Sequence, residues 1–136
     1  MFKKEKAETF TKLTLRIMGM RCTEEYEVVC GGESCQAARY LIMYARPEGD
    51  RRELQKSAEC SSDVVLDLLN KCNVIKWDGF SGANPRGVRD GWMINFEAEI
   101  NGKRIHAGGS NNFPKHYSEF REGIHSLIYD RGENNV

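Results

Sequence analysis

Apolar and polar residues alternate along the N-terminal part of the chain, which predicts β-strands. Residues 12–18 run Lys, Leu, Thr, Leu, Arg, Ile and Met. A period of two places the apolar side chains on one face of a half-buried strand. Tyr26, Val28 and Cys30 continue the same alternation and predict a second strand.

The next part of the chain gives a mixed signal. The first residues of segment 35–46 favour a helix, whereas its later aromatic and β-branched residues fit one face of a strand, and we interpret the segment as a strand. Residues 47–50, Pro-Glu-Gly-Asp, supply turn chemistry. A polar strand at 52–60 is then predicted at an edge of the sheet.

Two segments change to the helical period. Residues 62–73 form the first, with Ser62 as a plausible N-cap and Asn73 as a possible C-cap. The second is predicted at 114–129, with Pro114 as its first residue. Both present an apolar stripe at helical spacing: Val65, Leu66, Leu69 and Cys72 in the first, and Tyr117, Phe120, Ile124, Leu127 and Ile128 in the second.

The dipeptide Asn101-Gly102 predicts a hairpin, because a two-residue type I′ turn needs a positive φ at both positions. The turn fixes the register, so that Ile100 lies opposite Lys103. Along the strands, Glu99 then lies opposite Arg104, Ala98 opposite Ile105, and Glu97 opposite His106. One face carries apolar residues and the other is polar: Trp92, Ile94, Phe96, Ala98, Ile100, Ile105 and Ala107 against Asn95, Glu97, Glu99, Arg104 and His106.

Together these elements predict an α+β fold for residues 1–136 as a single domain. We expect an antiparallel sheet of five or six strands with two helices packed on one face. The chain is 40% hydrophobic and 29% charged, which is ordinary for one globular domain.

The charges of the chain disfavour two classes of partner. The 20 Lys and Arg balance the 20 Asp and Glu, and both signs are spread along the chain. Nucleic-acid and membrane binding rest on clustered positive charge, so neither is expected. The N-terminus lacks the apolar core of a signal peptide, which predicts a cytoplasmic protein.

Five cysteines are present, at positions 22, 30, 35, 60 and 72, and the odd number argues against a disulfide framework. Cys30 and Cys35 flank Gly-Gly-Glu-Ser and could close a small loop or supply two zinc ligands. No second close pair completes a four-ligand site. We therefore expect five reduced, structural thiols and no metal or other cofactor.

The three histidines are candidates for metal binding or catalysis. His116 and His125 are nine residues apart and would point to opposite sides of one helix, so they would not share a metal ion. Glu97, Glu99 and His106 share the polar face of the hairpin with Arg104. The four side chains are interpreted as a solvated face with complementary charges. The alternative is an acid–base cluster in which a carboxylate orients the imidazole.

Several short motifs between residues 77 and 114 carry a resemblance to a known group of proteins. They are Trp77-Asp78-Gly79-Phe80, Asp90-Gly91-Trp92, Asn101-Gly102-Lys103 and Ala107-Gly108-Gly109-Ser110-Asn111 followed by Phe113-Pro114. In this order they resemble a widespread family of small uncharacterised bacterial proteins. The resemblance covers about the C-terminal half of the chain and implies no established activity.

The glycine-rich stretches 78–91 and 108–112 are the predicted functional edge, because long connections without regular structure often serve binding. The alternatives are a packed connection without a partner and, at 108–112, simple capping of the following helix. The large aromatic residues would anchor the edge if they are not simply core, and polar residues would face the partner: Trp77, Phe80 and Trp92, with Asp78, Arg86, Asp90 and Asn111.

We therefore expect a non-catalytic binding or protein-interaction module. Its partner would be an unknown protein or a small ligand, with a homodimer through an exposed strand edge as one form. The alternative is a small hydrolase that uses the Glu97, Glu99 and His106 face.

Overall fold

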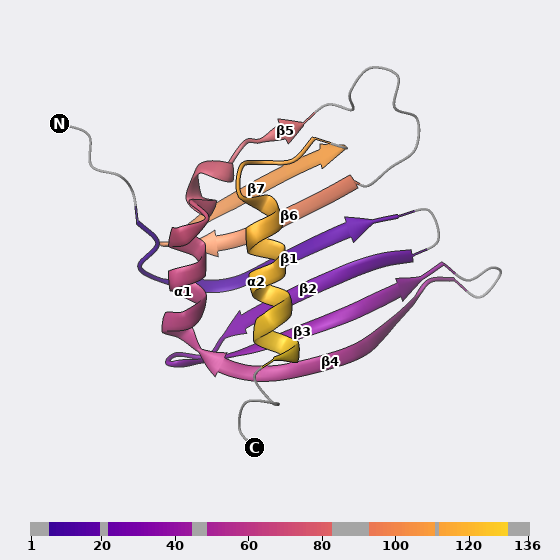
Figure 1. The fold of residues 1–136 in the computed structure, drawn as a ribbon, viewed down its shortest axis with the longest axis horizontal. Coiled ribbons are helices and arrows are strands. Elements are labelled where there is room, and N and C mark those ends of the chain that lie inside the picture. Colours follow the sequence, from indigo (N-terminus) through magenta and orange to yellow (C-terminus); the bar gives the residue numbers. More distant parts are fainter. Residues whose placement is uncertain (1–5, 20–21, 45–48, 83–92, 111, 131–136) are drawn as a thin grey trace.

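The computed structural model is an α+β fold in which one sheet carries both helices on the same face (Figure 1). The fold class is as predicted. The structure describes residues 6–19, 22–44, 49–82, 93–110 and 112–130.

Seven strands form the sheet, in the order β4-β3-β2-β1-β6-β7-β5. All neighbours are antiparallel except β5 and β7. Their bounds are β1 Phe10–Met18, β2 Cys22–Cys30, β3 Ser34–Met43, β4 Arg51–Ser61, β5 Ser81–Gly82, β6 Met93–Ile100 and β7 Lys103–Ser110. The ambiguous segment after residue 34 is a strand, and the polar strand β4 lies at an edge, as predicted.

The expected purely antiparallel sheet of five or six strands differs from this in one element. β5 has only two residues and runs parallel to β7. Backbone bonds from Gly79 N to His106 O and from Gly108 N to Phe80 O, at 2.8 and 2.9 Å, hold the chain beside β7. Two residues are too few to show a period of two, so the sequence carries no signal for this strand.

The two α-helices are α1 at Ser62–Lys71 and α2 at Tyr117–Tyr129. A short 3₁₀ helix, η1, follows α1 in the chain at Val74–Trp77. The N-cap of α1 is Ser61, whose hydroxyl accepts a hydrogen bond from Asp63 N, so the predicted cap at Ser62 is wrong by one residue. The predicted start of the second helix at Pro114 is also wrong. His116 precedes α2 with a φ of 69°, a left-handed conformation that interrupts the helix before Tyr117.

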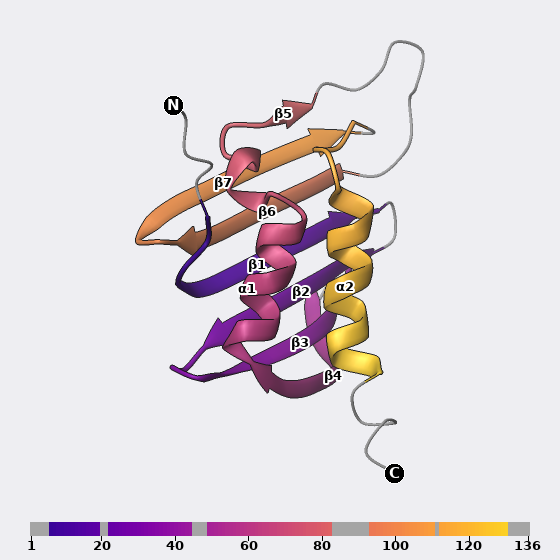
Figure 2. The same ribbon diagram turned by 60° about the vertical axis from the view of Figure 1, so that its left-hand side comes forward.

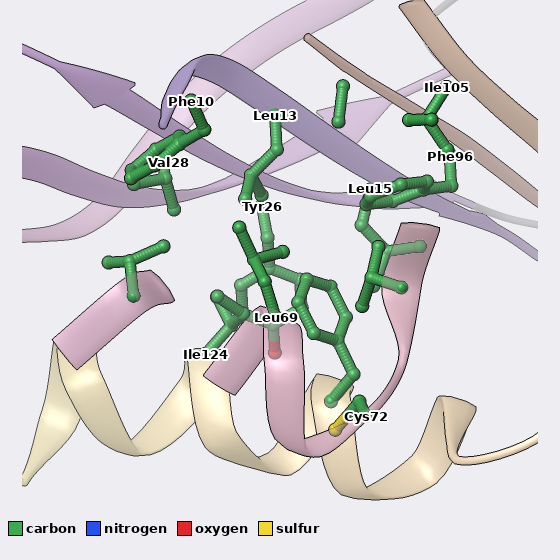
Figure 3. Packing of buried hydrophobic residues seen from close by; sticks show 14 of the residues in the cluster. Phe10, Leu13, Leu15, Tyr26, Val28, Leu69, Cys72, Phe96, Ile105 and Ile124 are labelled. Carbon is green, nitrogen blue, oxygen red and sulfur yellow. The ribbon is translucent and has the colours of Figure 1, made fainter. Parts of the chain in front are cut away.

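The hydrophobic core lies between the sheet and the two helices (Figures 2 and 3). Trp77, Phe96 and Phe120 meet edge to face, with ring centroids 5.1–5.7 Å apart. Edge-to-face pairs at this distance add to the stabilisation that burial provides. These three rings therefore join η1, β6 and α2.

The predicted hairpin register is confirmed for every described pair from Met93–Ser110 to Ile100–Lys103. Asn101 and Gly102 have φ values of 53° and 76°, as a type I′ turn requires. The Asn101 side chain also binds the segment before β1, because its amide oxygen accepts hydrogen bonds from Glu8 N and Thr9 N. The turn thus anchors the chain just before β1.

In the part of the chain that the structure describes, neither helix combines the length and the apolar character needed to cross a membrane.

Candidate functional site

The face of the sheet opposite the helices is here called the open face (Figure 2). Strand alternation places Leu13 and Leu15 of β1 against the helices, whereas Lys12, Thr14 and Arg16 point to the open face. The pairing register extends the polar rows across β2 and β6. The polar face that the hairpin sequence predicts is thus one end of a larger surface.

A hollow of about 570 Å³ lies on the open face. Cations and carboxylates surround it in equal number: Lys12, Arg16, Arg52 and Arg104 with Glu25, Glu27, Glu97 and Glu99. They come from β1, β2, β4, β6 and β7. Such a surface matches a ligand or partner that itself carries both signs of charge.

Glu25 is the most buried of these charged side chains, with 1% of its surface exposed. Its carboxylate accepts from Arg16 Nε at 2.9 Å and from Arg52 Nε at 2.7 Å. Burial alone would raise the pKa of Glu25, but the hydrogen bonds from Arg52 and Arg16 outweigh it, so the pKa lies below its ordinary value. Glu25 therefore stays ionised and holds two guanidinium groups in fixed positions.

Arg52 makes a second contact that orders its side chain. Its guanidinium lies 3.5 Å from the ring centroid of Tyr40 on the neighbouring strand β3, which is a cation–π geometry. It also reaches Glu27 at 3.4 Å. One edge strand thus presents an arginine that is fixed by an aromatic ring and two carboxylates.

The charges of the hairpin pair diagonally. Arg104 lies opposite Glu99 in the register, but its Nη2 atom donates to Glu97 Oε1 at 2.7 Å. This hydrogen bond lowers the pKa of Glu97. Glu97 is therefore an ionised acceptor already engaged by an arginine, which does not suit a general acid.

Large apolar side chains are also exposed on the open face. Leu54 and Met93 expose 55% and 51% of their surface, and Tyr44 and Val29 expose 44% and 41%. The first two lie on β4 and β6, and Val29 lies on β2. Tyr44 follows β3 and shares a hydrogen bond with Thr23. The open face therefore combines guanidinium groups, tyrosines and exposed apolar side chains.

Of the seven residues named for the predicted functional edge, three lie in the described part of the chain, and they gather beside β7. Trp77 is 3% exposed, and its indole Nε1 donates to Lys115 O at 3.0 Å. Phe80 is half-buried against the core, and the exposed Asp78 accepts from His106 N at 3.0 Å. Trp77 thus packs the core and Asp78 fastens the chain to β7. Whether they also bind a partner stays a prediction.

The other predicted residues, Arg86, Asp90, Trp92 and Asn111, lie outside the described residues. The structure therefore leaves their grouping with Trp77, Asp78 and Phe80 as a prediction.

The glycines beside this region have a packing role. A Cβ atom at Gly82 or at Gly109 would collide with the backbone carbonyl oxygen of Asn112. Gly108, in contrast, has room, since a Cβ there would lie 3.5 Å from Ile94 O. Close approach of the backbone thus explains Gly82 and Gly109.

A second charged cluster lies on the helix side and was not predicted. Glu24 accepts from Arg39 Nε at 2.7 Å and from Arg121 Nη2 of α2 at 2.8 Å, beside a hollow of about 470 Å³. Burial would raise the pKa of Glu24, but these two arginines lower it. Arg121 and Glu24 thereby tie α2 to the sheet. The polar Glu24 and Arg39 within otherwise apolar strand faces were the available sequence signal.

The histidines lie apart in the described structure. His116 contacts Glu119 at 3.0 Å, His125 Nδ1 lies 2.8 Å from the Tyr26 hydroxyl, and the backbone of His106 binds Asp78. Among the described residues, no group of three or more His, Cys, Asp or Glu is arranged to hold a metal ion.

Comparison of the chain with protein-family models and with curated proteins gave no match. The resemblance of residues 77–114 to small bacterial proteins therefore stays a prediction.

Proposed function

We propose that this protein is a non-catalytic protein-interaction module that binds its partner on the open face. One observation carries the proposal. Four of the six large apolar side chains that the described chain exposes lie on this face, beside the arginine groups: Val29, Tyr44, Leu54 and Met93. These side chains are spread over several strands among the arginines and tyrosines, and a face that mixes exposed apolar, tyrosine and guanidinium groups is typical of a protein interface.

The composition of the surface also supports this function. Arginine, tyrosine and methionine are enriched in protein interfaces, and arginine and tyrosine often dominate the binding free energy. Arg52 and Tyr40 lie on neighbouring strands and are already in contact. Because Glu25 and Tyr40 fix Arg52 before binding, less side-chain entropy would be lost when a partner docks.

The mixed charge of the face limits the choice of partner. A nucleic acid would meet the four carboxylates around the hollow as well as the four cations. A protein surface with interleaved charges fits better, and a second copy of this chain is one such surface. Cytoplasmic location and the absence of a membrane partner remain part of this proposal.

The hydrolase alternative has less support from the geometry. It needs Glu97 or Glu99 to act with His106, whereas Glu97 is held by Arg104. His106 lies directly opposite Glu97 in the register, so the carboxylate opposite it is the one that Arg104 already binds. Assay of a panel of ester and phosphoester substrates with wild type and Glu99→Gln tests this alternative, and turnover lost in the variant would support it.

The interaction proposal is tested with two matched variants that place a charge on opposite faces. Leu54→Glu changes the open face, and Val64→Glu changes α1, where Val64 is 37% exposed. Each purified variant is first checked for its fold by circular dichroism. Sedimentation velocity over a range of concentrations then measures self-association, and binding to partners isolated by cross-linking in cells is measured by calorimetry.

The expected result is that wild type and Val64→Glu bind the same partner with the same affinity, whereas Leu54→Glu binds it at least about tenfold more weakly. This factor corresponds to about 1.4 kcal/mol, a modest loss for a charge introduced into an interface. Equal binding by all three proteins, or loss only in Val64→Glu, would contradict the proposal.

A further inference from the structure

Three cysteines lie side by side at one end of the sheet, on its helix side. Cys30 of β2 is directly opposite Cys35 of β3, and Cys35 is directly opposite Cys60 of β4. At the same end, α1 begins immediately after β4 (Figure 1). The structure holds none of the five cysteines, all of which lie in its described part, in a disulfide.

Cys30 and Cys35 are placed for reaction with each other. Directly opposite residues of antiparallel strands have Cα atoms about 4.5 or 5.5 Å apart, and both values fall in the range that a disulfide accepts. The hydroxyl of Ser62 contacts both sulfurs, at 3.4 Å from Cys30 Sγ and 3.5 Å from Cys35 Sγ. Cys60 is one strand farther from Cys30, and two strand spacings of about 4.8 Å exceed a disulfide's reach.

The two thiols differ in their surroundings. Cys30 is half-buried and lines a hollow of about 850 Å³ at the N-terminus of α1, whereas Cys35 is 1% exposed. The hydrogen bond with Ser62 lowers the pKa of the Cys30 thiol, while burial raises the pKa of Cys35 to about 11. A partly exposed thiol at a helix N-terminus is the usual setting of a reactive cysteine.

We propose that Cys30 and Cys35 form a peroxide-sensitive thiol pair, in which Cys30 is the nucleophile and Cys35 the resolving thiol. The site is separate from the open face and does not depend on the proposed function. Glu8, Glu33 and Asp63 line the hollow beside Cys30. Their negative charge opposes the Cys30 thiolate, which the Ser62 hydroxyl and the N-terminus of α1 favour, and it also disfavours anionic oxidants such as glutathione disulfide. Neutral hydrogen peroxide is therefore the matching substrate.

The reaction has two balanced steps. The Cys30 thiolate attacks one oxygen of hydrogen peroxide, the S–O bond forms, the O–O bond breaks, and the released hydroxide takes a proton to become water. The Cys35 sulfur then attacks the sulfenic acid sulfur. The S–S bond forms, the S–O bond breaks, and the Cys35 proton leaves with the hydroxyl group as a second water. Two thiols are oxidised and one peroxide is reduced.

The test uses the 136-residue chain, reduced and then exposed to hydrogen peroxide under native conditions. Alkylation and mass spectrometry count the remaining thiols, and cleavage after Glu33 separates Cys30 from Cys35 in sequence. The expected result is a fall from five thiols to three, with the two peptides joined by a disulfide. Cys22, also half-buried, is the internal reference for exposure alone. Oxidation of Cys30 no faster than Cys22 would overturn the proposal.

Variants separate the two roles. In Cys35→Ser, Cys30 should stop at the sulfenic acid, which dimedone labels, and no disulfide should form. Cys72→Ser, which removes a fully buried thiol elsewhere, should form the disulfide as wild type does. A disulfide that persists in Cys35→Ser, or one that joins Cys60 in the wild type, would contradict the assignment. If a variant does not fold, the thiol count and the disulfide-linked peptides of the wild type still test the proposal.

Discussion

The two faces of the sheet are built from the same strands, but one carries buried apolar side chains and the other carries charged side chains. Towards the helices, β1 presents Leu13 and Leu15, which are fully buried and pack against α1 and α2. Towards the open face, the residues between and beside them are Lys12, Thr14 and Arg16, which line a charged hollow. Burial of apolar area stabilises the fold, whereas partly solvated ion pairs contribute little. The side of the sheet that stabilises the fold is thus opposite the side that we propose for recognition.

The largest difference between the faces is expected from Phe120→Ala. Phe120 is fully buried and contacts Trp77 and Phe96. Its truncation should lower the free energy of unfolding by about 3–5 kcal/mol, from lost burial and the cavity left behind. Leu54→Ala on the open face should change it by less than about 0.5 kcal/mol. Urea unfolding measures both, and equal effects would remove the distinction between the faces.

Glu25→Gln tests the buried charge that the described part of the open face contains. The variant loses the charge that Arg16 and Arg52 bind, so the free energy of unfolding should fall by about 1.5–3 kcal/mol at pH 7. Because the pKa of Glu25 is lowered by folding, its contribution is complete above the ordinary carboxylate pKa of 4.5 and is lost as the pH falls through the folded value. Urea unfolding from pH 7 to 3 should show the two proteins converging, and a constant difference would contradict this origin.

Gly108 and Gly109 are neighbours on β7, and side chains at these two positions would point to opposite faces of the sheet. Gly109→Ala would place a Cβ against the Asn112 carbonyl and should cost about 1–3 kcal/mol, as overpacking does. A Cβ atom at Gly108 would point to the other side of the strand and lie at van der Waals distance from Ile94 O. Gly108→Ala should therefore leave the free energy of unfolding nearly unchanged. Thermal unfolding of both variants measures the difference. Equal destabilisation would mean that β7 resists any side chain here.

The smallest effect is expected at the hairpin pair. Arg104 and Glu97 are exposed on the open face and joined at 2.7 Å. A double-mutant cycle with Arg104→Ala and Glu97→Ala should give a coupling of about 0.2–1 kcal/mol, and the value should fall with added salt. A coupling that is large and insensitive to salt would show that this part of the face is shielded from water.

Sequence periodicity predicted the strands well, because each has eight or more residues over which alternation repeats, apart from β5. The hairpin was predicted in register, since Asn101-Gly102 leaves little freedom to the turn. The start of α2 was predicted wrongly at Pro114, because the local sequence does not show that Trp77 binds Lys115 O or that His116 is left-handed.

The candidate site was predicted less completely. The alternation of apolar and polar residues predicted the polar face of the hairpin. The rest of the hollow comes from β1, β2 and β4, and the sequence does not show which strands lie beside these three in the sheet. Nothing in the local sequence marks Glu25 as buried, because Arg16 and Arg52 come from two other strands. Trp77 lies in the core, which is one of the two interpretations that the sequence offered for it.

The central position of β1 has a consequence for synthesis of the chain. Leu13 pairs with Val28 on one side and with Ala98 on the other. At about 5–20 residues per second, the ribosome completes the β1–β4 meander several seconds before β6 is made. During that interval one edge of β1 has no strand beside it and the apolar face has no α2. We therefore expect the nascent chain to need protection from aggregation until the hairpin emerges.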